Sequence, residues 1–116
     1  MTQNLINLYS DTQTKPSAEM REAIANAEVG DEQQEADPTT NRLQDMVAEL
    51  LGKEAALFLP SGVMCNQIAV KVWTNPGEEI ILHESAHIVN FESGGAAALS
   101  GTMTRNLTGD RGMFTA

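Results

Sequence analysis

Pro60-Ser61-Gly62-Val63 is the stretch of the chain best suited to hold an anion. It lies between an apolar run and the predicted start of a helix, where free backbone N–H groups and the helix dipole attract negative charge. Gly62 lets the backbone approach closely, and Ser61 can donate its hydroxyl. The alternative is that Ser61 only caps the helix, since serine is among the commonest N-caps. The sequence thus predicts either a phosphate site or a plain cap, and the two common nucleotide-binding glycine motifs do not occur in it.

The two histidines, His83 and His87, are four residues apart just after a predicted strand, where α/β sheets place many ligand sites. On one helix they would share a face and could bind a metal ion. His83 is expected to end the strand, however, and zinc needs further ligands, so no metal site is predicted. The alternative for each histidine is a hydrogen-bonded, partly buried imidazole. Cys65, the single cysteine, has no nearby histidine and is predicted to lie in the core.

Three helices are predicted to position these residues. The first begins after Ser17, which can cap it, and the second has Asp37 as N-cap, Pro38 in its first turn and Gly52 as a left-handed C-cap. The third covers residues 61–73. Apolar side chains recur at helical spacing and are expected to face inward: Met20, Ala23, Ile24 and Ala27 in the first helix, Leu43, Met46, Val47, Leu50 and Leu51 in the second, and Met64, Ile68, Ala69 and Val72 in the third.

Strands are predicted at residues 55–59 and 79–82, with a weaker one at 102–107. The crossover through the third helix is long enough to make the first two strands parallel, so we expect a right-handed βαβ unit in an α/β sheet. A short helix near residues 85–91 and a small-residue stretch at 93–101 lie between the last two strands. Two or three parallel strands leave open edges and faces, which predicts a fragment or a chain that folds only against another one.

Composition excludes several classes of partner. The chain has 116 residues, with 16 acidic and 7 basic side chains and a net charge of -9, which argues against binding to nucleic acid or an acidic membrane. One cysteine cannot form an intramolecular disulfide, and no targeting leader or apolar run of about 20 residues is recognised. The acidic residues 31–35 are expected to form a solvated loop. These features predict a soluble globular domain in the cytoplasm.

Taken together, the segments resemble the N-terminal part of the L-threonine aldolase family, in the β-eliminating lyase branch of fold-type I pyridoxal-phosphate enzymes. The resemblance depends on the order and spacing of short motifs along nearly the whole chain. They are residues 10–16, 20–23, 29–31, 37–43, 49–56, 60–64, 86–88 and 92–101.

This resemblance implies the fold and the roles of individual residues. Residues 1–16 would be an N-terminal extended segment and loop, and residues 17–116 the first part of the large cofactor-binding domain, with a βαβ unit from a mostly parallel sheet. Ser61, Gly62 and Val63 would hold the phosphate of pyridoxal 5'-phosphate. His87 would stack on the pyridine ring and assist proton transfer, and Ser10 would contact the substrate carboxylate. Two positions depart from the family: Val63 replaces a frequent threonine, and residues 34–36 replace Tyr-Gly-Glu.

The resemblance also implies an activity, the cleavage of a threonine-like β-hydroxy-α-amino acid to glycine and an aldehyde by a carbon–carbon lyase. The alternatives are a related lyase acting on another 3-hydroxy amino acid, such as phenylserine, or a non-catalytic fragment or structural partner. Lys15, Lys53 and Lys71 do not match the Schiff-base lysine of the family, so the chain alone is expected to be inactive. That lysine, the Asp at the pyridine nitrogen and the Arg for the substrate carboxylate are expected beyond residue 116. The family forms dimers or tetramers, so we expect the remainder of the chain and a homo-oligomer as partners.

Overall fold

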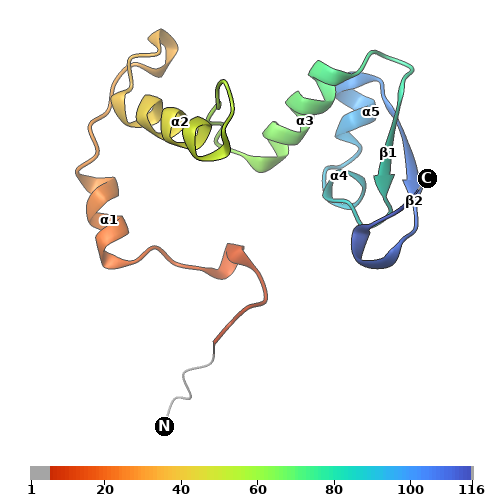
Figure 1. Cartoon of the computed structure of the whole chain (residues 1–116), viewed down its shortest axis with the longest axis horizontal. Coiled ribbons are helices and arrows are strands. Elements are labelled where there is room, and N and C mark those ends of the chain that lie inside the picture. Colours follow the sequence, from red (N-terminus) through yellow and green to blue (C-terminus); the bar gives the residue numbers. More distant parts are fainter. Residues whose placement is uncertain (1–5, 116) are drawn as a thin grey trace. The chain divides into compact units, whose positions relative to one another are not determined.

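A computed structural model describes residues 6–115 of the chain, and these fall into two compact units. The first unit extends to Phe58 and the second begins at Leu59. Figure 1 shows the elements of each unit. The predicted division between residues 1–16 and 17–116 stays a prediction, and residues 1–5 lie outside the described part of the chain.

The first unit consists of helical segments joined by polar loops. A short 3-10 turn, η1 (Asp11–Gln13), precedes helix α1 (Ala18–Ala25), and a second turn, η2 (Glu32–Gln34), precedes helix α2 (Pro38–Leu51). Ser17 caps α1 as predicted, because its Oγ accepts a hydrogen bond of 3.2 Å from the Met20 N–H. The acidic residues 31–35 are exposed, as the sequence predicts.

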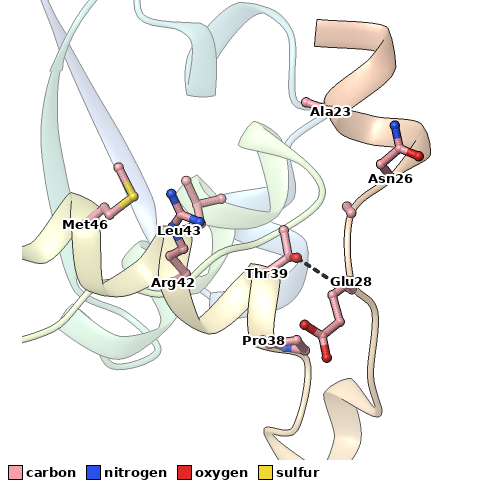
Figure 2. A pocket seen from close by; sticks show the side chains of 9 residues that line it. Ala23, Asn26, Glu28, Pro38, Thr39, Arg42, Leu43 and Met46 are labelled. Atoms are coloured by element: carbon pink, nitrogen blue, oxygen red, sulfur yellow. Dashed lines mark hydrogen bonds between the residues drawn. The ribbon is translucent and has the colours of Figure 1, made fainter. Parts of the chain in front are cut away.

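Helix α2 begins and ends where its capping residues predict. Asp37 Oδ1 accepts a 2.8 Å hydrogen bond from the Thr40 N–H, while its Oδ2 accepts one of 2.9 Å from the Gly30 N–H. Gly52 ends the helix in the left-handed conformation, at φ 60°. Figure 2 shows a recess of about 520 Å³ beside the start of α2, where the Thr39 hydroxyl donates a 2.6 Å hydrogen bond to the Glu28 carbonyl.

The apolar stripes of α1 and α2 have the predicted spacing but are not buried within the first unit. In α1, Met20 is 60% and Ile24 70% exposed; in α2, Leu50 is 82% exposed. The prediction of a buried stripe is therefore wrong for this part of the protein. The physical reason is that periodicity identifies the face that repels water, whereas burial requires a second surface to meet it.

The second unit contains the sheet. Helix α3 (Gly62–Trp73) leads to strand β1 (Glu79–His83), followed by α4 (His87–Asn90), α5 (Gly95–Ser100), strand β2 (Met103–Leu107) and a 3-10 turn, η3 (Asp110–Gly112). The two strands are parallel, with Glu79 opposite Met103 and His83 opposite Leu107. In Figure 1 they lie side by side, and α5 lies beside α3. The predicted α/β class with a parallel sheet is confirmed.

The predicted strand at residues 55–59 is wrong, because this run is extended but belongs to no ladder in the described chain. A strand exists only through the hydrogen bonds of a neighbour. Here the Phe58 N–H donates instead to the side-chain Oε1 of Gln44, at 2.9 Å. The parallel crossover unit consequently runs from β1 through α4 and α5 to β2. The small-residue stretch at 93–101, for which no helix was predicted, supplies α5.

The core of the second unit lies between α3 and α5. Val70 and Ala96 are the buried apolar side chains of residues 6–115, at 7% and 3% exposure. The face of α3 that packs inward thus carries Gln67 and Val70, and the predicted inward face is wrong: Met64, Ile68 and Val72 are 42%, 40% and 71% exposed. Cys65 is exposed as well, not in the core. The error arises because α3 turns a polar residue toward α5.

Across residues 6–115, none of the helices combines the length and the apolar character that a membrane crossing requires.

Candidate functional site

The N-terminus of α3 presents unpaired donors. Ser61 is the N-cap, and its Oγ accepts a 3.4 Å hydrogen bond from the Met64 N–H, which confirms the predicted cap. The N–H groups of Gly62 and Val63 donate to no acceptor in the described chain. A Cβ atom added to Gly62 would meet nothing within 4 Å, so this turn is open to a ligand. Two free amides and a hydroxyl at the positive end of a 12-residue helix form a suitable anion site.

His87 is the first residue of α4, and its imidazole is anchored at one nitrogen. Nδ1 lies 2.8 Å from Oε1 of Glu92, and the side chain is 58% exposed. Nε2 contacts no hydrogen-bonding group of residues 6–115. The ring of Phe91 lies 5.2 Å away between centroids, tilted by 45°. The imidazole therefore has a fixed edge and a free edge, an arrangement suited to stacking and to proton exchange.

Glu92 is the centre of a buried hydrogen-bond network that sequence reasoning missed. Its side chain is 0% exposed. Oε1 accepts a 2.6 Å hydrogen bond from Asn66 Nδ2 as well as the one from His87, and Oε2 accepts a 2.6 Å bond from Gln67 Nε2. The bond from Asn66, with smaller contributions from His87 and Gln67, lowers the pKa of Glu92 below its ordinary 4.5, against the opposing effect of burial. The carboxylate is thus ionised near neutral pH.

The network connects α4 to α3. Asn66 and Gln67 lie on α3 little more than one turn after the free amides, so the anchor of His87 and the candidate anion site share one helix. Gly95 makes room for the network, since a Cβ there would lie 2.7 Å from the carbonyl carbon and oxygen of the Gln67 side chain. The sequence signal was a single acidic residue among small and apolar ones, five positions after His87.

His83 has a different environment from His87. It ends β1, as predicted, and both of its ring nitrogens have partners: Nδ1 lies 2.7 Å from the Ser85 hydroxyl and Nε2 lies 3.2 Å from the Gly109 carbonyl. This is the hydrogen-bonded imidazole that the alternative interpretation predicts. Over the part of the chain that the structure describes, no three His, Cys, Asp or Glu side chains are placed to hold a metal ion.

Ser10 belongs to the first unit. It caps η1: its Oγ accepts a 3.2 Å hydrogen bond from the Thr12 N–H and lies 2.8 Å from the Thr12 hydroxyl. The contact with a substrate carboxylate that the resemblance implies for Ser10 stays a prediction.

The residues of the second unit fit pyridoxal 5'-phosphate. Its phosphate requires hydrogen-bond donors without competing acceptors, which the amides of Gly62 and Val63 provide. Its flat pyridine ring could stack on the imidazole of His87, which is accessible and anchored at Nδ1. Val63 contributes its backbone N–H alone, because valine has no hydroxyl.

Comparison with known proteins places the chain in a family. Residues 7–116 match the sequence profile of the β-eliminating lyases. The chain belongs to the β-eliminating lyase family. The predicted family is thereby confirmed, and with it the predicted fold class, since the parallel β1–β2 pair is consistent with the N-terminal part of the fold-type I architecture.

Several members of this family are similar to the chain over most of its length. A probable low-specificity L-threonine aldolase of Arabidopsis thaliana is 48% identical over 103 residues, covering 88% of the chain and 29% of that protein. A low specificity L-threonine aldolase of Escherichia coli is 52% identical over 95 residues, covering 82% of the chain and 28% of that protein. The corresponding aldolase of Saccharomyces cerevisiae is 43% identical over 98 residues, covering 84% and 25%. The chain therefore spans less than a third of the relatives it matches.

Proposed function

We propose that the protein containing these residues is a pyridoxal-phosphate-dependent aldolase that cleaves a threonine-like β-hydroxy-α-amino acid to glycine and an aldehyde. The observation that carries the proposal is the pairing, in one unit, of an open helix N-terminus with an anchored and exposed imidazole. The names of the relatives, which are L-threonine aldolases, support the choice of substrate class.

In this proposal the start of α3 binds the cofactor phosphate. The N–H groups of Gly62 and Val63 donate to its oxygens, and the Ser61 hydroxyl donates a third hydrogen bond while it accepts from the Met64 N–H. The absence of a side chain at Gly62 allows the phosphate to approach the backbone. The helix dipole adds a favourable charge interaction.

In this proposal His87 has two roles, stacking on the pyridine ring and transferring protons. The bound cofactor supplies an electron sink for the carbanion of glycine. The imidazole of His87 would pack against the flat ring and exclude water from it, and its Nε2 would exchange a proton with the reacting groups. The hydrogen bond between Nδ1 and Glu92 favours this orientation of the ring.

Further parts of the proposal rest on the resemblance. Ser10 contacts the substrate carboxylate, and the lysine that binds the cofactor covalently is none of Lys15, Lys53 and Lys71. We also propose a homo-oligomeric enzyme of the cytoplasm, in keeping with a single cysteine and an acidic composition.

The test is to incubate the full-length protein, loaded with pyridoxal 5'-phosphate, with threonine, allo-threonine and phenylserine, and to measure the aldehyde released. Cleavage of threonine or allo-threonine is the expected result. Cleavage of phenylserine alone would assign the protein to the related lyases, and no cleavage of any of the three would overturn the aldolase proposal.

A further inference from the structure

We propose that Glu92 is a positioning residue for His87, holding its ring in the tautomer with the proton on Nδ1 and a free lone pair on Nε2. This rests on the proposed function only for its consequence in catalysis, because the contact itself belongs to the described chain. Nδ1 of His87 and Oε1 of Glu92 are 2.8 Å apart, which is a normal hydrogen bond.

The unequal burial of the two partners shows which one holds the other. The Glu92 side chain is 0% exposed, whereas that of His87 is 58% exposed. A buried carboxylate is costly unless it is hydrogen bonded, and a solvated imidazole has no such requirement. Glu92 is therefore the fixed member of the pair, and His87 extends from it toward solvent.

The donors on α3 determine the protonation of the pair. Asn66 Nδ2 donates to Oε1 and Gln67 Nε2 donates to Oε2, each at 2.6 Å, so both oxygens already act as acceptors. An ionised carboxylate can only accept, which leaves Nδ1–H as the donor in its bond with His87. The pKa of Glu92, lowered chiefly by the bond from Asn66, agrees with an ionised group. Within residues 6–115, Glu92 is the charged group that contacts His87.

The consequence for catalysis is that Nε2 of His87 can act as a base, with its lone pair held in a fixed orientation. When Nε2 takes up a proton, a bond from that nitrogen to hydrogen forms, the donor's bond to the same hydrogen breaks, and the ring becomes an imidazolium. The carboxylate stays ionised and stabilises the new positive charge. Carboxylates that orient metal-ligating histidines affect metal affinity or activity by about 10- to 100-fold, and we expect an effect of the same order for Glu92 on His87.

The first test needs no substitution. Histidine-selective ¹⁵N labelling of the full-length protein, with and without cofactor, reports the tautomer of each neutral imidazole, and His87→Asn identifies the signal of His87. A proton on Nδ1 is the expected result. A proton on Nε2 with a bare Nδ1 would overturn the proposal, whether or not any aldol cleavage is observed.

The second test asks whether Glu92 acts through His87. We expect Glu92→Gln to lower kcat by about 10- to 100-fold, to populate the other tautomer, and to be partly rescued in Glu92→Asp, which keeps the charge. In a His87→Phe background the same Glu92→Gln change should have little further effect, as expected for coupled residues. Equal losses in both backgrounds would show that Glu92 does not work through His87.

The matched control is Glu79→Gln. Glu79 is an exposed carboxylate of the same unit that pairs with Arg105 at 2.6 Å, so the chemical change is identical while the site is left intact. The tautomer of His87 and kcat should be unchanged there. Should Glu92→Gln fail to fold, the wild-type tautomer and the milder Asn66→Ala variant, which removes one donor to Glu92, still decide the proposal. A change in the His87 tautomer between wild type and Asn66→Ala supports the proposal.

Discussion

Asp37 in the first unit and Glu92 in the second are both buried carboxylates, with residue exposures of 9% and 6%, and the pKa of each is lowered by hydrogen bonds. Their donors differ. Asp37 accepts from the backbone N–H groups of Thr40 and Gly30, which fix a loop to the start of α2. Glu92 accepts from the side chains of Asn66, Gln67 and His87.

This difference separates a structural role from a functional one. A backbone N–H group has no second polar atom that its hydrogen bond could orient. The hydrogen bonds of Asp37 therefore stabilise local structure only. A side-chain donor such as the imidazole of His87 has a second nitrogen, and fixing the first nitrogen orients the second toward solvent. A buried carboxylate therefore indicates a functional site when one of its donors is itself titratable and exposed.

If Glu92 serves a functional site and Asp37 does not, the largest effect on activity is expected from substitutions of His87. His87→Phe keeps a flat ring and should retain most of the cofactor affinity, whereas His87→Asn should lose it. Both should lower turnover by about 10²- to 10⁴-fold if the imidazole transfers protons. Steady-state kinetics and cofactor titration of the full-length protein measure the two effects separately.

His83 provides the control for this prediction. Its two nitrogens are already bonded to Ser85 and Gly109, so His83→Asn should change stability slightly and turnover hardly at all. Loss of activity in His83→Asn together with an active His87→Asn would show that the functional histidine has been assigned to the wrong position.

The next largest effect is expected at the anion site. Ser61→Ala removes one hydroxyl donor and leaves the amides of Gly62 and Val63. Losing a hydrogen bond to a charged acceptor costs about 1.5 to 3 kcal/mol, which weakens cofactor binding roughly 10- to 150-fold. Titration of apo-protein with pyridoxal 5'-phosphate checks this, and equal affinities would reduce Ser61 to the helix cap already seen.

A smaller effect, on stability alone, is expected where Gly30 meets Asp37. A Cβ at Gly30 would collide with the carbonyl of Ala36, so Gly30→Ala must displace the loop and weaken the bond to Asp37. Overpacking of this kind costs about 1 to 3 kcal/mol, measurable by urea unfolding. Gly62→Ala is the matched control, since its Cβ meets nothing and apo-protein stability should rise by about 0.4 to 1 kcal/mol. Similar losses in both variants would contradict this close contact between Gly30 and Ala36.

The smallest expected effect is a dependence of stability on acid pH. For Glu92 the largest cause of the lowered pKa is the bond from Asn66, and for Asp37 it is the Thr40 N–H. Since both folded-state pKa values lie below the ordinary 4.5 and 3.8, the stabilisation is complete above those values and is lost as pH falls through the folded-state pKa. Urea midpoints between neutral and acid pH should fall less steeply in Glu92→Gln and in Asp37→Asn than in wild type. Curves parallel to wild type would show that neither carboxylate contributes.

Local signals in the sequence predicted the capped helix boundaries, although α1 ends at Ala25, before the predicted Ala27. Asp37, Pro38 and Gly52 define α2, and Ser17 and Ser61 cap their helices as expected, because capping depends on residues within a few positions of each other. The apolar run at 55–59 failed for the opposite reason: a strand depends on a neighbour that the run itself does not specify.

The candidate site was predicted in part. Ser61 and His87 stood out by residue type and spacing, and the structure gives each an accessible polar group. Glu92, Asn66 and Gln67 could not be found that way, because their significance arises from contacts across 25 and 26 positions of sequence. The inward face of α3 was misassigned for the same reason, since a polar Gln67 is buried only because Glu92 is there to accept its hydrogen bond.

The exposed apolar stripe of α2 has a consequence for the stability of this helix. Covering one leucine or methionine fully is worth about 1.5 to 3 kcal/mol, and Leu43, Met46, Leu50 and Leu51 are 44%, 55%, 82% and 63% exposed. Together they approach the roughly 5 to 15 kcal/mol by which an entire domain is stable. Isolated helices of about this length are marginal in water. We therefore expect formation of α2 to be coupled to the covering of its apolar face, while the caps determine where the helix starts and stops.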